Sequence, residues 1–484
     1  MELPLTASRD EPGSLAAQLV AQLRAAMMEG RLARGERLPA TRAMAAELGV
    51  SRTVIKDAYA QLFAEGWIEG RHGSGTYVAG DAFGNQAPAA GRIAAGPYTQ
   101  PGPAAASTPP PVDLRPGIPW TAGIDRAAWR RAWRSAGFKP PGTASDPAGI
   151  PELRQGLSAY LRRARGIRCT IDQILVTSGV AAGLSLIAAA LLRPGDRAGV
   201  EEPGYPVARA VLAAHGVQVV PCPVDADGLV VSDLPAGLKL VYTTPAHQYP
   251  LGGRLPIVRR QALTAWARAQ GAMIVEDDYD GEFRYDVAPL PALSGLDPEV
   301  VVYLGSTTKT FTPALRLGWL AAAPPLITRL AEAAGQLGGW AAEPAQQALL
   351  TLLATGDLER HIRRMRHEYA RRRAAVTTTF ADGTAGRLLG DQAGLHVVLH
   401  TRHDAETVAA TAGRQGVAVG TLTRFYASPC DTGSLVIGYG GAPLPDVARG
   451  CRVIRQILSG TSGRAPALPG CLGQWPAPRF APPG

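Results

Sequence analysis

The spacing of hydrophobic residues changes along the chain and predicts its organisation. Apolar residues recur at helical spacing within 12–79, whereas short apolar runs alternate with helix-length segments from 112 to 458. Residues 80–111 are rich in Ala, Gly and Pro and carry almost no charge, and residues 459–484 are rich in Gly and Pro. We therefore expect a small helical domain, a flexible linker, a large domain and a disordered tail.

The first region predicts three helices and a hairpin. Leucine or methionine recurs every four residues within 14–30, where Gly30 is placed to end the helix. In 35–70, Gly49 is placed to end a second helix and Ser51 to cap a third. The apolar residues of the third helix are expected to share its buried side: Val54 or Ile55, Ala58, Leu62 and Phe63. The segment WIEGRHGSGTYVAG predicts two short strands around a Gly-rich tip.

The large region predicts an α/β domain. Five apolar runs are typical of buried strands: QILVTSG, RAGVEEP, KLVYTTP, AMIVEDD and VVYLGS. A helix-like segment at 180–192 follows the first run. Strands that alternate with helices form mainly parallel sheets, because two parallel neighbours need a crossover connection.

Composition narrows the class of protein. The chain has 484 residues, 46% hydrophobic and 18% charged, which fits a soluble globular protein of roughly two to four domains. Its longest nearly apolar run, 181–192, is too short to cross a bilayer, and the N-terminus lacks the pattern of a secretory signal. The five cysteines form no C-x-x-C pair, so neither a disulfide framework nor a metal site is predicted and a cytoplasmic location is expected.

The net charge of +9 suggests a polyanionic partner, but its distribution weakens that argument. Residues 1–79 contain nine Lys or Arg and nine Asp or Glu, so a DNA contact there needs a local basic patch. Only four of the 49 basic residues are lysines, which makes a lysine within a motif informative. The Arg-rich segment 361–375 is a candidate for a solvated face, for interface ion pairs or for DNA contact.

The small domain has the order of a DNA reader. Arg52, Thr53 and Lys56 fall on the exposed first turn of the third helix, where a recognition helix meets base edges. A helical module with solvated basic residues would give the same local patterns. The whole order, helix, LPATR, helix, GVSRT, helix, EGWIE and GSGTYV, resembles the GntR-type winged helix-turn-helix. This resemblance implies double-stranded DNA as a partner and these contact residues: Arg42, Ser51, Arg52, Thr53, Lys56, His72 and Gly73.

The sharpest chemical motif is GSTTKTFTPALRLGW at 305–319. Lys309 follows a buried strand, with hydroxyls at 306–308 and Arg316 seven residues later. An amine can form a Schiff base with an aldehyde cofactor, while hydroxyls and a guanidinium can bind a phosphate dianion. The simpler alternative is a surface lysine beside a threonine-rich turn.

Three other motifs favour the same site. In AMIVEDDYDGEFRY, Asp277 or the less favoured Asp278 can keep a pyridine nitrogen protonated, and Tyr279 can bind the ring's O3′. A run of acids can also be a solvated turn or a metal ligand. VTSGVAAGL puts Gly179 at a strand-to-helix turn, which binds phosphate or is an ordinary helix start. EEPGYP offers Tyr205 for stacking on a ring, or as part of a packed turn.

Together these motifs resemble fold-type I aminotransferases over 112–458. A GntR-type reader joined to such a domain is similar to the MocR-type regulators. The expected fold class is therefore multidomain, a small α/β winged helix-turn-helix plus a large α/β aminotransferase-like domain. The resemblance implies pyridoxal 5′-phosphate (PLP) on Lys309, with Asp277 at the pyridine nitrogen, Tyr279 at O3′ and Tyr205 stacked on the ring. It also implies these phosphate-binding residues: Gly179, Val180, Ala181, Ser306, Thr308 and Arg316.

Three positions depart from the aminotransferase pattern. Tyr249 stands where aminotransferases have an asparagine on O3′, and Ala144 where they have a tyrosine that reaches the phosphate of the other subunit. Val436 lies in the strand that normally carries the arginine for the ligand's α-carboxylate. Arg209 and Arg424 are the candidates to replace that arginine.

The expected function is that of a homodimeric transcription regulator. It would sense a small amine or amino-acid-type ligand, or a B6 vitamer, through its aminotransferase-like domain. The alternative is a catalytically active PLP-dependent aminotransferase, which the retained Lys309, Asp277 and Tyr279 favour. A DNA-binding scaffold that has lost its cofactor is the third interpretation.

Overall fold

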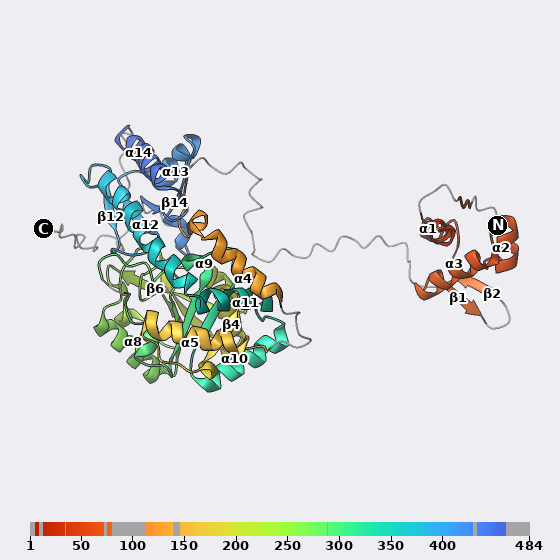
Figure 1. The fold of residues 1–484 in the computed structure, drawn as a ribbon, viewed down its shortest axis with the longest axis horizontal. Helices are drawn as coiled ribbons and strands as arrows, with labels where there is room; N and C mark the ends of the chain where they lie inside the picture. The colour runs from red at the N-terminus through yellow and green to blue at the C-terminus, as the bar shows by residue number, and fades with distance from the viewer. Residues whose placement is uncertain are drawn as a thin grey trace. The chain divides into compact units, whose positions relative to one another are not determined.

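The chain divides into two compact units, Met1–Ala106 and Ser107–Gly484 (Figure 1). The computed structural model describes residues 5–8, 13–33, 35–71, 75–79, 112–138, 146–287, 289–428 and 433–460. The predicted linker at 80–111 and residues 461–484 of the predicted tail lie outside the described residues, as do His72, Gly73 and Ala144. Ser459 and Gly460, which the prediction assigns to the tail, still belong to the last helix.

The smaller unit contains three helices and a hairpin, as predicted. Its elements are α1 (Leu15–Met28), α2 (Thr41–Glu47), α3 (Arg52–Ala64), β1 (Ile68–Arg71) and β2 (Gly75–Val78). Ser14 and Ser51 cap α1 and α3, because their hydroxyl oxygens accept hydrogen bonds from Ala17 N (3.2 Å) and Val54 N (3.4 Å). Gly49 follows the end of α2 with a φ of +63°, the left-handed conformation that glycine adopts without strain.

The core of the smaller unit lies between α1 and α3. Leu19, Leu23, Ile55 and Leu62 are fully buried there. The prediction for Phe63 is wrong, since Phe63 is 60% exposed. Successive residues of a helix are rotated by about 100°, so the residue after Leu62 points away from the core. The buried side of α3 consists instead of Ile55, Ala58, Tyr59 and Leu62.

The larger unit is built on an eight-stranded sheet with the order β4-β11-β10-β9-β8-β5-β6-β7. Its strands are β4 (Ile174–Thr177), β5 (Arg197–Glu202), β6 (Gln218–Asp225), β7 (Gly228–Leu229), β8 (Leu238–Thr243), β9 (Met273–Asp277), β10 (Val301–Ser306) and β11 (Gly318–Ala321). The pairs from β10 through β9, β8 and β5 to β6 are parallel. The prediction of a mainly parallel sheet is therefore confirmed, and β7 and β11 are antiparallel additions.

A second sheet has five strands in the order β12-β13-β15-β14-β3. These strands are β3 (Val112–Leu114), β12 (Arg387–Leu389), β13 (His396–His400), β14 (Val417–Thr421) and β15 (Ser434–Gly438). The first strand after the predicted linker thus pairs with a strand some three hundred residues later, Val112 opposite Val417. No local pattern predicts such a pairing, because it depends on the folded chain.

Helices cover both sheets. They are α4 (Arg126–Phe138), α5 (Pro151–Arg165), α6 (Val180–Leu191), α7 (Pro206–Ala214), α8 (Ile257–Gln270), α9 (Thr307–Thr310), α10 (Pro324–Leu337), α11 (Glu343–Ala354), α12 (Asp357–Thr379), α13 (Ala405–Arg414) and α14 (Leu444–Gly460). Short 3-10 helices lie at Thr121–Gly123, Ile171–Gln173, Val231–Asp233, Leu293–Gly295, Pro313–Leu315 and Thr423–Phe425. None of the described helices is long and apolar enough to cross a membrane.

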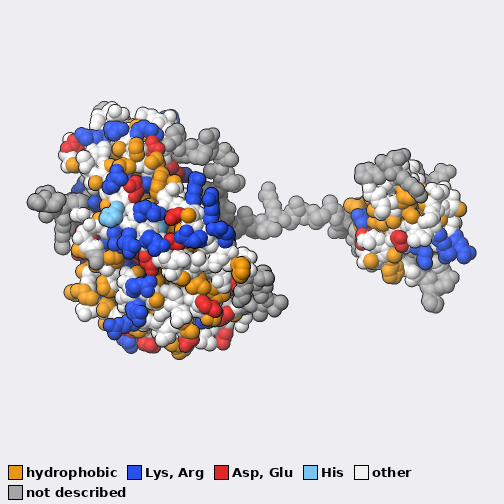
Figure 2. All heavy atoms as spheres, viewed as in Figure 1, with side chains coloured by type: hydrophobic (Ala, Val, Ile, Leu, Met, Phe, Trp, Pro, Cys, Tyr) orange, Lys and Arg blue, Asp and Glu red, His pale blue; other side chains and the backbone are white. Residues whose placement is uncertain are grey.

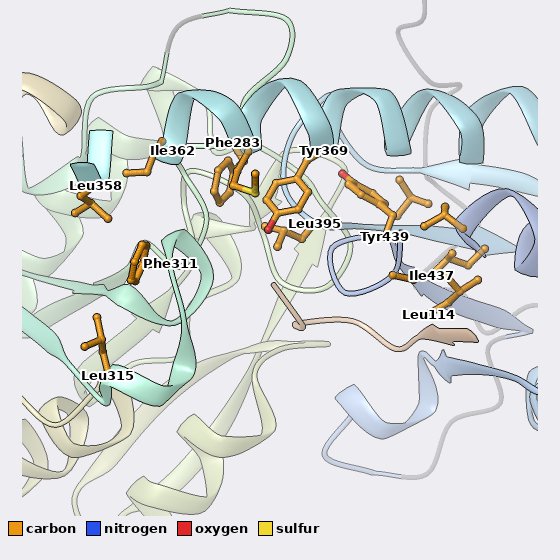
Figure 3. Packing of buried hydrophobic residues seen from close by; sticks show 14 of the residues in the cluster. Leu114, Phe283, Phe311, Leu315, Leu358, Ile362, Tyr369, Leu395, Ile437 and Tyr439 are labelled. Atoms are coloured by element: carbon orange, nitrogen blue, oxygen red, sulfur yellow. The ribbon is translucent and has the colours of Figure 1, made fainter. Parts of the chain in front are cut away.

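The long helix α12 joins the two sheets of the larger unit. In Figure 1 it runs between the end that carries α13 and α14 and the end that carries α5, α8 and α10. Figure 3 shows Leu358 and Ile362 of α12 beside Phe311, and Tyr369 farther along beside Leu395 and Tyr439. All belong to one hydrophobic core. The segment that follows Lys309 is therefore packed into the same core as the five-stranded sheet.

Arginine side chains cover part of the outer face of α12 and α4 (Figure 2). The exposed arginines of these helices include Arg130, Arg134, Arg363 and Arg371. The expectation of a solvated face holds only in part, because Arg372, in the same segment, is buried. Its guanidinium lies 4.2 Å from the Trp120 ring centroid and donates a hydrogen bond to Gly440 O at 2.7 Å.

Candidate functional site

The site lies where three parallel strands end at one edge of the large sheet. Strand β11 runs antiparallel between β4 and β10, and Gly318 at its start pairs with both Thr177 and Ser306. The ends of β4 and β10 are therefore level, and β9 ends beside them at Asp277. A Cβ at Gly318 would lie 3.0 Å from the Gly179 Cα and 2.9 Å from the Gly305 carbonyl oxygen, so this close approach needs glycine.

All the cofactor-binding residues predicted from the sequence line one pocket at this edge. They are Lys309, Asp277, Tyr279, Tyr205, Gly179, Val180, Ala181, Ser306, Thr308 and Arg316. Three further residues line the pocket: Ser178, Thr244 and Tyr249. Ligand sites in open α/β sheets lie at the carboxyl ends of the strands, and this pocket has that position.

Lys309 lies on α9, the single helical turn that follows β10. Its Nζ donates a hydrogen bond to the carbonyl oxygen of Gly117 at 2.5 Å. Burial lowers the pKa of Lys309, while the negative charges of Asp280 and Asp277 act in the opposite direction. A lowered pKa increases the fraction of neutral amine, which is the form that attacks an aldehyde carbon.

The structure separates the two adjacent carboxylates of the acidic motif. Asp278 forms an ion pair with the buried Arg165 and accepts a hydrogen bond from Tyr303 Oη at 2.7 Å. Asp277 instead lines the pocket, and its Oδ2 accepts a very short hydrogen bond from Tyr242 Oη. Oδ1 of Asp277 is buried and has no hydrogen-bond partner among the described residues. Burial raises the pKa of Asp277 to about 7.

The unpartnered oxygen of Asp277 is the observation by which we judge whether a pyridine cofactor fits the pocket. A buried carboxylate oxygen without a donor is costly, and a pyridinium N–H would satisfy it. The positive charge of that ring would also favour the ionised carboxylate and so lower the pKa of Asp277. The donors at the other end of the pocket suit a phosphate. The residues present therefore fit PLP at both ends.

The phosphate end is formed by the start of α6 and by α9. Gly179 is the N-cap of α6 with a φ of +110°, a conformation that side chains rarely adopt. The first N–H groups of this twelve-residue helix have no partner within the helix and attract an anion. Ser306 and Thr308 face the same pocket, as does Arg316, a non-glycine residue with a φ of +50°. Such backbone strain is typical of functional sites.

Aromatic rings form the wall for a planar ligand. Tyr205 is stacked on Tyr242, with ring centroids 6.4 Å apart, and meets Tyr249 edge-on at 5.9 Å. Tyr279 meets Tyr249 edge-on at 5.2 Å. The hydroxyl of Tyr279 lies 2.8 Å from His247 Nδ1. Tyr205 and Tyr279 both line the pocket, so each can contact a ring placed between Lys309 and Asp277.

Val436, the position at which the resemblance to aminotransferases predicts an arginine, lies among apolar side chains. Val436 is fully buried in a cluster that consists of Val224, Leu251, Leu389, Val398, Leu422, Phe425 and Val436, with Tyr249 and Tyr426 packed against it. We call these residues the Val436 cluster. Nη1 of Arg209 donates to Phe425 O at 2.9 Å and to Gly204 O at 3.3 Å, and it lies 3.4 Å from a carboxylate oxygen of Glu202. Arg424 lies over the Phe425 ring, and its charge lowers the pKa of Tyr249 against the larger effect of burial.

Most of the predicted DNA contacts lie on one turn and its surroundings. Ser51, Arg52, Thr53 and Lys56 are exposed on the first turns of α3, and Arg42 is exposed on α2. Arg52 Nε donates to Thr41 Oγ1 at 3.4 Å, which links the starts of the two helices. The arrangement presents basic and hydroxyl side chains at the N-terminal end of the second helix of a helix-turn-helix, the end that meets base edges.

Sequence reasoning missed several residues that shape the pocket. Tyr242 binds Asp277, and Thr244 Oγ1 accepts a hydrogen bond from Tyr249 N at 2.9 Å. His247 binds Tyr279. All three lie in or beside the motif KLVYTTPAHQYPLG, which marks a strand followed by a turn. The motif alone does not show that its side chains reach residues thirty positions later.

Two family models match the chain. "Aminotransferase class I and II" matches residues 127–454, and "Bacterial regulatory proteins, gntR family" matches residues 15–78. The chain is 37% identical over 440 residues to the HTH-type pyridoxine biosynthesis transcriptional regulator PdxR of Corynebacterium glutamicum, covering 91% of this chain and 95% of that protein. It is 33% identical over 473 residues to the probable rhizopine catabolism regulatory protein MocR of Rhizobium meliloti, covering 94% and 96%.

The fold of the larger unit is similar to that of solved aminotransferases. The kynurenine aminotransferase of Pyrococcus horikoshii matches with a TM-score of 0.66 and 24% identity, over 73% of this chain and 91% of that chain. The predicted fold class is thus confirmed. With both family models and these relatives over nearly its whole length, the chain belongs to the MocR-type HTH transcriptional regulators, in which a GntR-type winged helix-turn-helix is joined to an aminotransferase-like domain.

Proposed function

We propose that this regulator binds PLP through Lys309 and that PLP, rather than an amino acid, is its signal. The chain would then report the supply of the B6 cofactor to the genes it controls. The observation that carries the proposal is a contrast within one site. Every residue predicted to hold the cofactor lines the pocket, whereas the position of the substrate-carboxylate arginine is Val436 in an apolar cluster.

The chemistry of the pocket supports PLP as the ligand. PLP bound as a Schiff base acts as an electron sink, and this property depends on a protonated pyridine nitrogen. Asp277 would hold that proton with its unpartnered Oδ1, and Tyr279 would donate to O3′. Gly179, Val180, Ala181, Ser306, Thr308 and Arg316 would bind the phosphate, and Tyr205 would cover the ring.

The Val436 cluster supports a signal without a free carboxylate. A carboxylate placed against buried aliphatic side chains would lose its hydration without gaining a partner, which costs more than the roughly 2–7 kcal/mol of a buried neutral polar group. The C. glutamicum relative is named for pyridoxine biosynthesis, which agrees with a B6 vitamer as the signal.

The reader domain would bind double-stranded DNA as part of a homodimer. We propose Arg42, Ser51, Arg52, Thr53, Lys56, His72 and Gly73 as its DNA contacts. Two readers would offset the absence of net charge in residues 1–79, because phosphate neutralisation adds over both copies.

The second candidate is a working aminotransferase. Lys309, Asp277 and Tyr279 lie together in the pocket, as transamination needs. Steady formation of a keto acid from an amino donor, with a second keto acid as acceptor, would support this function. Spectral change in a single turnover without product would count against it.

The deciding experiment measures DNA affinity as a function of PLP. An operator is selected from random duplexes with the full-length protein, and its dissociation constant is measured for wild type and Lys309→Ala with PLP, with pyridoxal and with amino acids. We expect PLP to change the affinity of wild type about tenfold or more, a coupling of about 1.4 kcal/mol, and to leave Lys309→Ala unchanged. Amino acids should add nothing.

Two results would contradict the proposal. Absence of sequence-dependent binding at moderate salt would exclude the regulator function. An affinity that responds to an amino acid, while PLP alone has no effect, would make PLP a cofactor and the amino acid the signal.

A further inference from the structure

A buried histidine and carboxylate lie directly behind Tyr279. His247 and Asp280 are 3% and 1% exposed. The Nδ1 atom of His247 is 3.1 Å from both carboxylate oxygens of Asp280 and 2.8 Å from the hydroxyl oxygen of Tyr279. Neither His247 nor Asp280 lines the pocket, and neither is among the residues predicted to bind the cofactor.

The chemistry of these groups fixes where the protons lie. An ionised carboxylate only accepts hydrogen bonds, so Nδ1 of His247 carries the proton and donates it to Asp280. Because the same N–H points toward the Tyr279 oxygen, that oxygen acts as a second acceptor in a three-centre bond. In this arrangement none of the described residues accepts the hydroxyl proton of Tyr279, so the proton can be donated into the pocket.

The imidazole of His247 has little freedom to leave this arrangement. A Cβ at Gly394 would lie 2.1 Å from His247 Cε1 and 2.6 Å from Asp280 Oδ2, and a Cβ at Gly252 would lie 3.2 Å from His247 Nε2. The ring is also stacked on Tyr279, with centroids 5.8 Å apart and an interplanar angle of 26°. Two glycines thus allow the backbone to close around the ring.

We propose that His247, held by Asp280, is a positioning residue that keeps the hydroxyl proton of Tyr279 directed at O3′ of PLP. This inference rests on the proposed function, since it assumes that PLP occupies the pocket. The donor would favour the anionic form of O3′ and so lower the pH at which the proton between Lys309 Nζ and O3′ is lost.

Other titratable groups lie around Tyr279 and His247. The charges of Asp277 and Glu201 and the neighbouring Tyr249 act on Tyr279, Lys309 lines the same pocket, and His396 is packed against His247. His396 Nε2 lies 2.8 Å from the carbonyl oxygen of Pro250, so it is a donor there and Nδ1 is unprotonated in the neutral ring. Burial lowers the pKa of His396 to about 4, which keeps this ring neutral.

The test is a pH titration of the visible absorption of PLP bound to the full-length protein. We expect Tyr279→Phe and His247→Leu each to raise the midpoint by about one pH unit, because each removes or disorients the donor to O3′. The double variant should match Tyr279→Phe alone, since His247 acts only through that hydroxyl. His247→Asn, whose amide N–H can replace Nδ1–H, should stay near the wild-type midpoint.

His396→Leu is the matched control, because it removes a buried imidazole whose centroid is 5.4 Å from that of His247 and which has no hydrogen bond to Tyr279. Its midpoint should not move. An unmoved midpoint in His247→Leu, or a shift that adds to that of Tyr279→Phe, overturns the inference. If His247→Leu does not fold, His247→Phe, which keeps a stacked ring without an N–H donor, replaces it, and a wild-type midpoint there overturns the inference equally. A wild-type protein that shows no band with PLP overturns the proposed function instead.

Discussion

The pocket around Lys309 and the Val436 cluster are neighbouring regions, and they differ in the chemistry of their side chains. The pocket contains an amine, a carboxylate oxygen with no hydrogen-bond partner among the described residues, and strained backbone at Arg316. The Val436 cluster consists of buried apolar side chains. Tyr249 belongs to both, since it lines the pocket and packs against the cluster.

Under the proposed function, the difference teaches how one fold could hold a cofactor without taking an amino-acid substrate. The residues that line the pocket include those at the ends of β9 and β10 and at the start of α6, which the large sheet places together. Val398 and Val436 of the apolar cluster lie instead on β13 and β15 of the five-stranded sheet, so substitutions there need not disturb the pocket. A sensor of PLP needs only the pocket around Lys309, whereas a transaminase also needs a site for the carboxylate of its substrate.

The largest expected effect is that of Lys309→Ala. Without the amine no Schiff base forms, so the visible absorption of PLP-treated protein should disappear completely. Absorption spectra of wild type and variant after dialysis against PLP measure this. Lys239→Ala, which removes another of the four lysines, is the control and should keep the band. A band that persists in Lys309→Ala would place the reactive amine elsewhere.

Val436→Arg tests whether the Val436 cluster is closed to a charged side chain. An arginine there would be buried without a partner, so the free energy of unfolding should fall by about 3–5 kcal/mol. Chemical denaturation of wild type, Val436→Arg and the apolar control Val436→Leu measures this, with less than about 1.5 kcal/mol expected for the control. If Val436→Arg were stable and turned over amino acids, the Val436 cluster would lack only an arginine to bind a substrate carboxylate.

Asp277→Asn should change the pH dependence of stability in the PLP-free protein. Burial raises the pKa of Asp277 from 3.8 to about 7, so the folded state binds more protons than the unfolded state between these values. The contribution of Asp277 is fully present below about pH 4 and is lost as the pH rises through 7, on the order of 4 kcal/mol. Across this range the unfolding free energy of wild type should fall more steeply with rising pH than that of Asp277→Asn, because asparagine does not titrate. Curves of equal slope would contradict the burial argument.

The smallest expected effects compare two arginines beside the site. Arg316→Gln should weaken PLP binding about tenfold, because one charge-assisted contact to phosphate is lost. Arg424→Gln should change it less than about twofold, since Arg424 lies beside Phe425 and not in the pocket lining. Fluorescence titration with PLP measures both. Equal losses would show that Arg424 also reaches the cofactor.

Much of the fold could be predicted from local patterns. The five apolar runs are strands, Ser51 caps α3 and Gly49 ends α2, because these features depend on residues close in the sequence. The exposure of Phe63 was not predictable from its apolar character alone, since its neighbour Leu62 takes the core position. The roles of Tyr242 and His247 were not predictable either, because their partners lie about thirty residues away.

The sequence by itself determined the two-part architecture and the set of chemical groups at the cofactor site. Those groups come directly after predicted strands. Because parallel strands end at the same edge of a sheet, the sequence already predicts that the groups lie close together. Only the tertiary structure shows which of Asp277 and Asp278 lies in the pocket. Successive side chains along an extended backbone point to opposite sides, so Asp277 faces the pocket and Asp278 faces Arg165. The tertiary structure also decided that Val436 lies in a closed cluster and that His247 holds Tyr279, because burial and hydrogen-bond partners come from segments that only folding brings together.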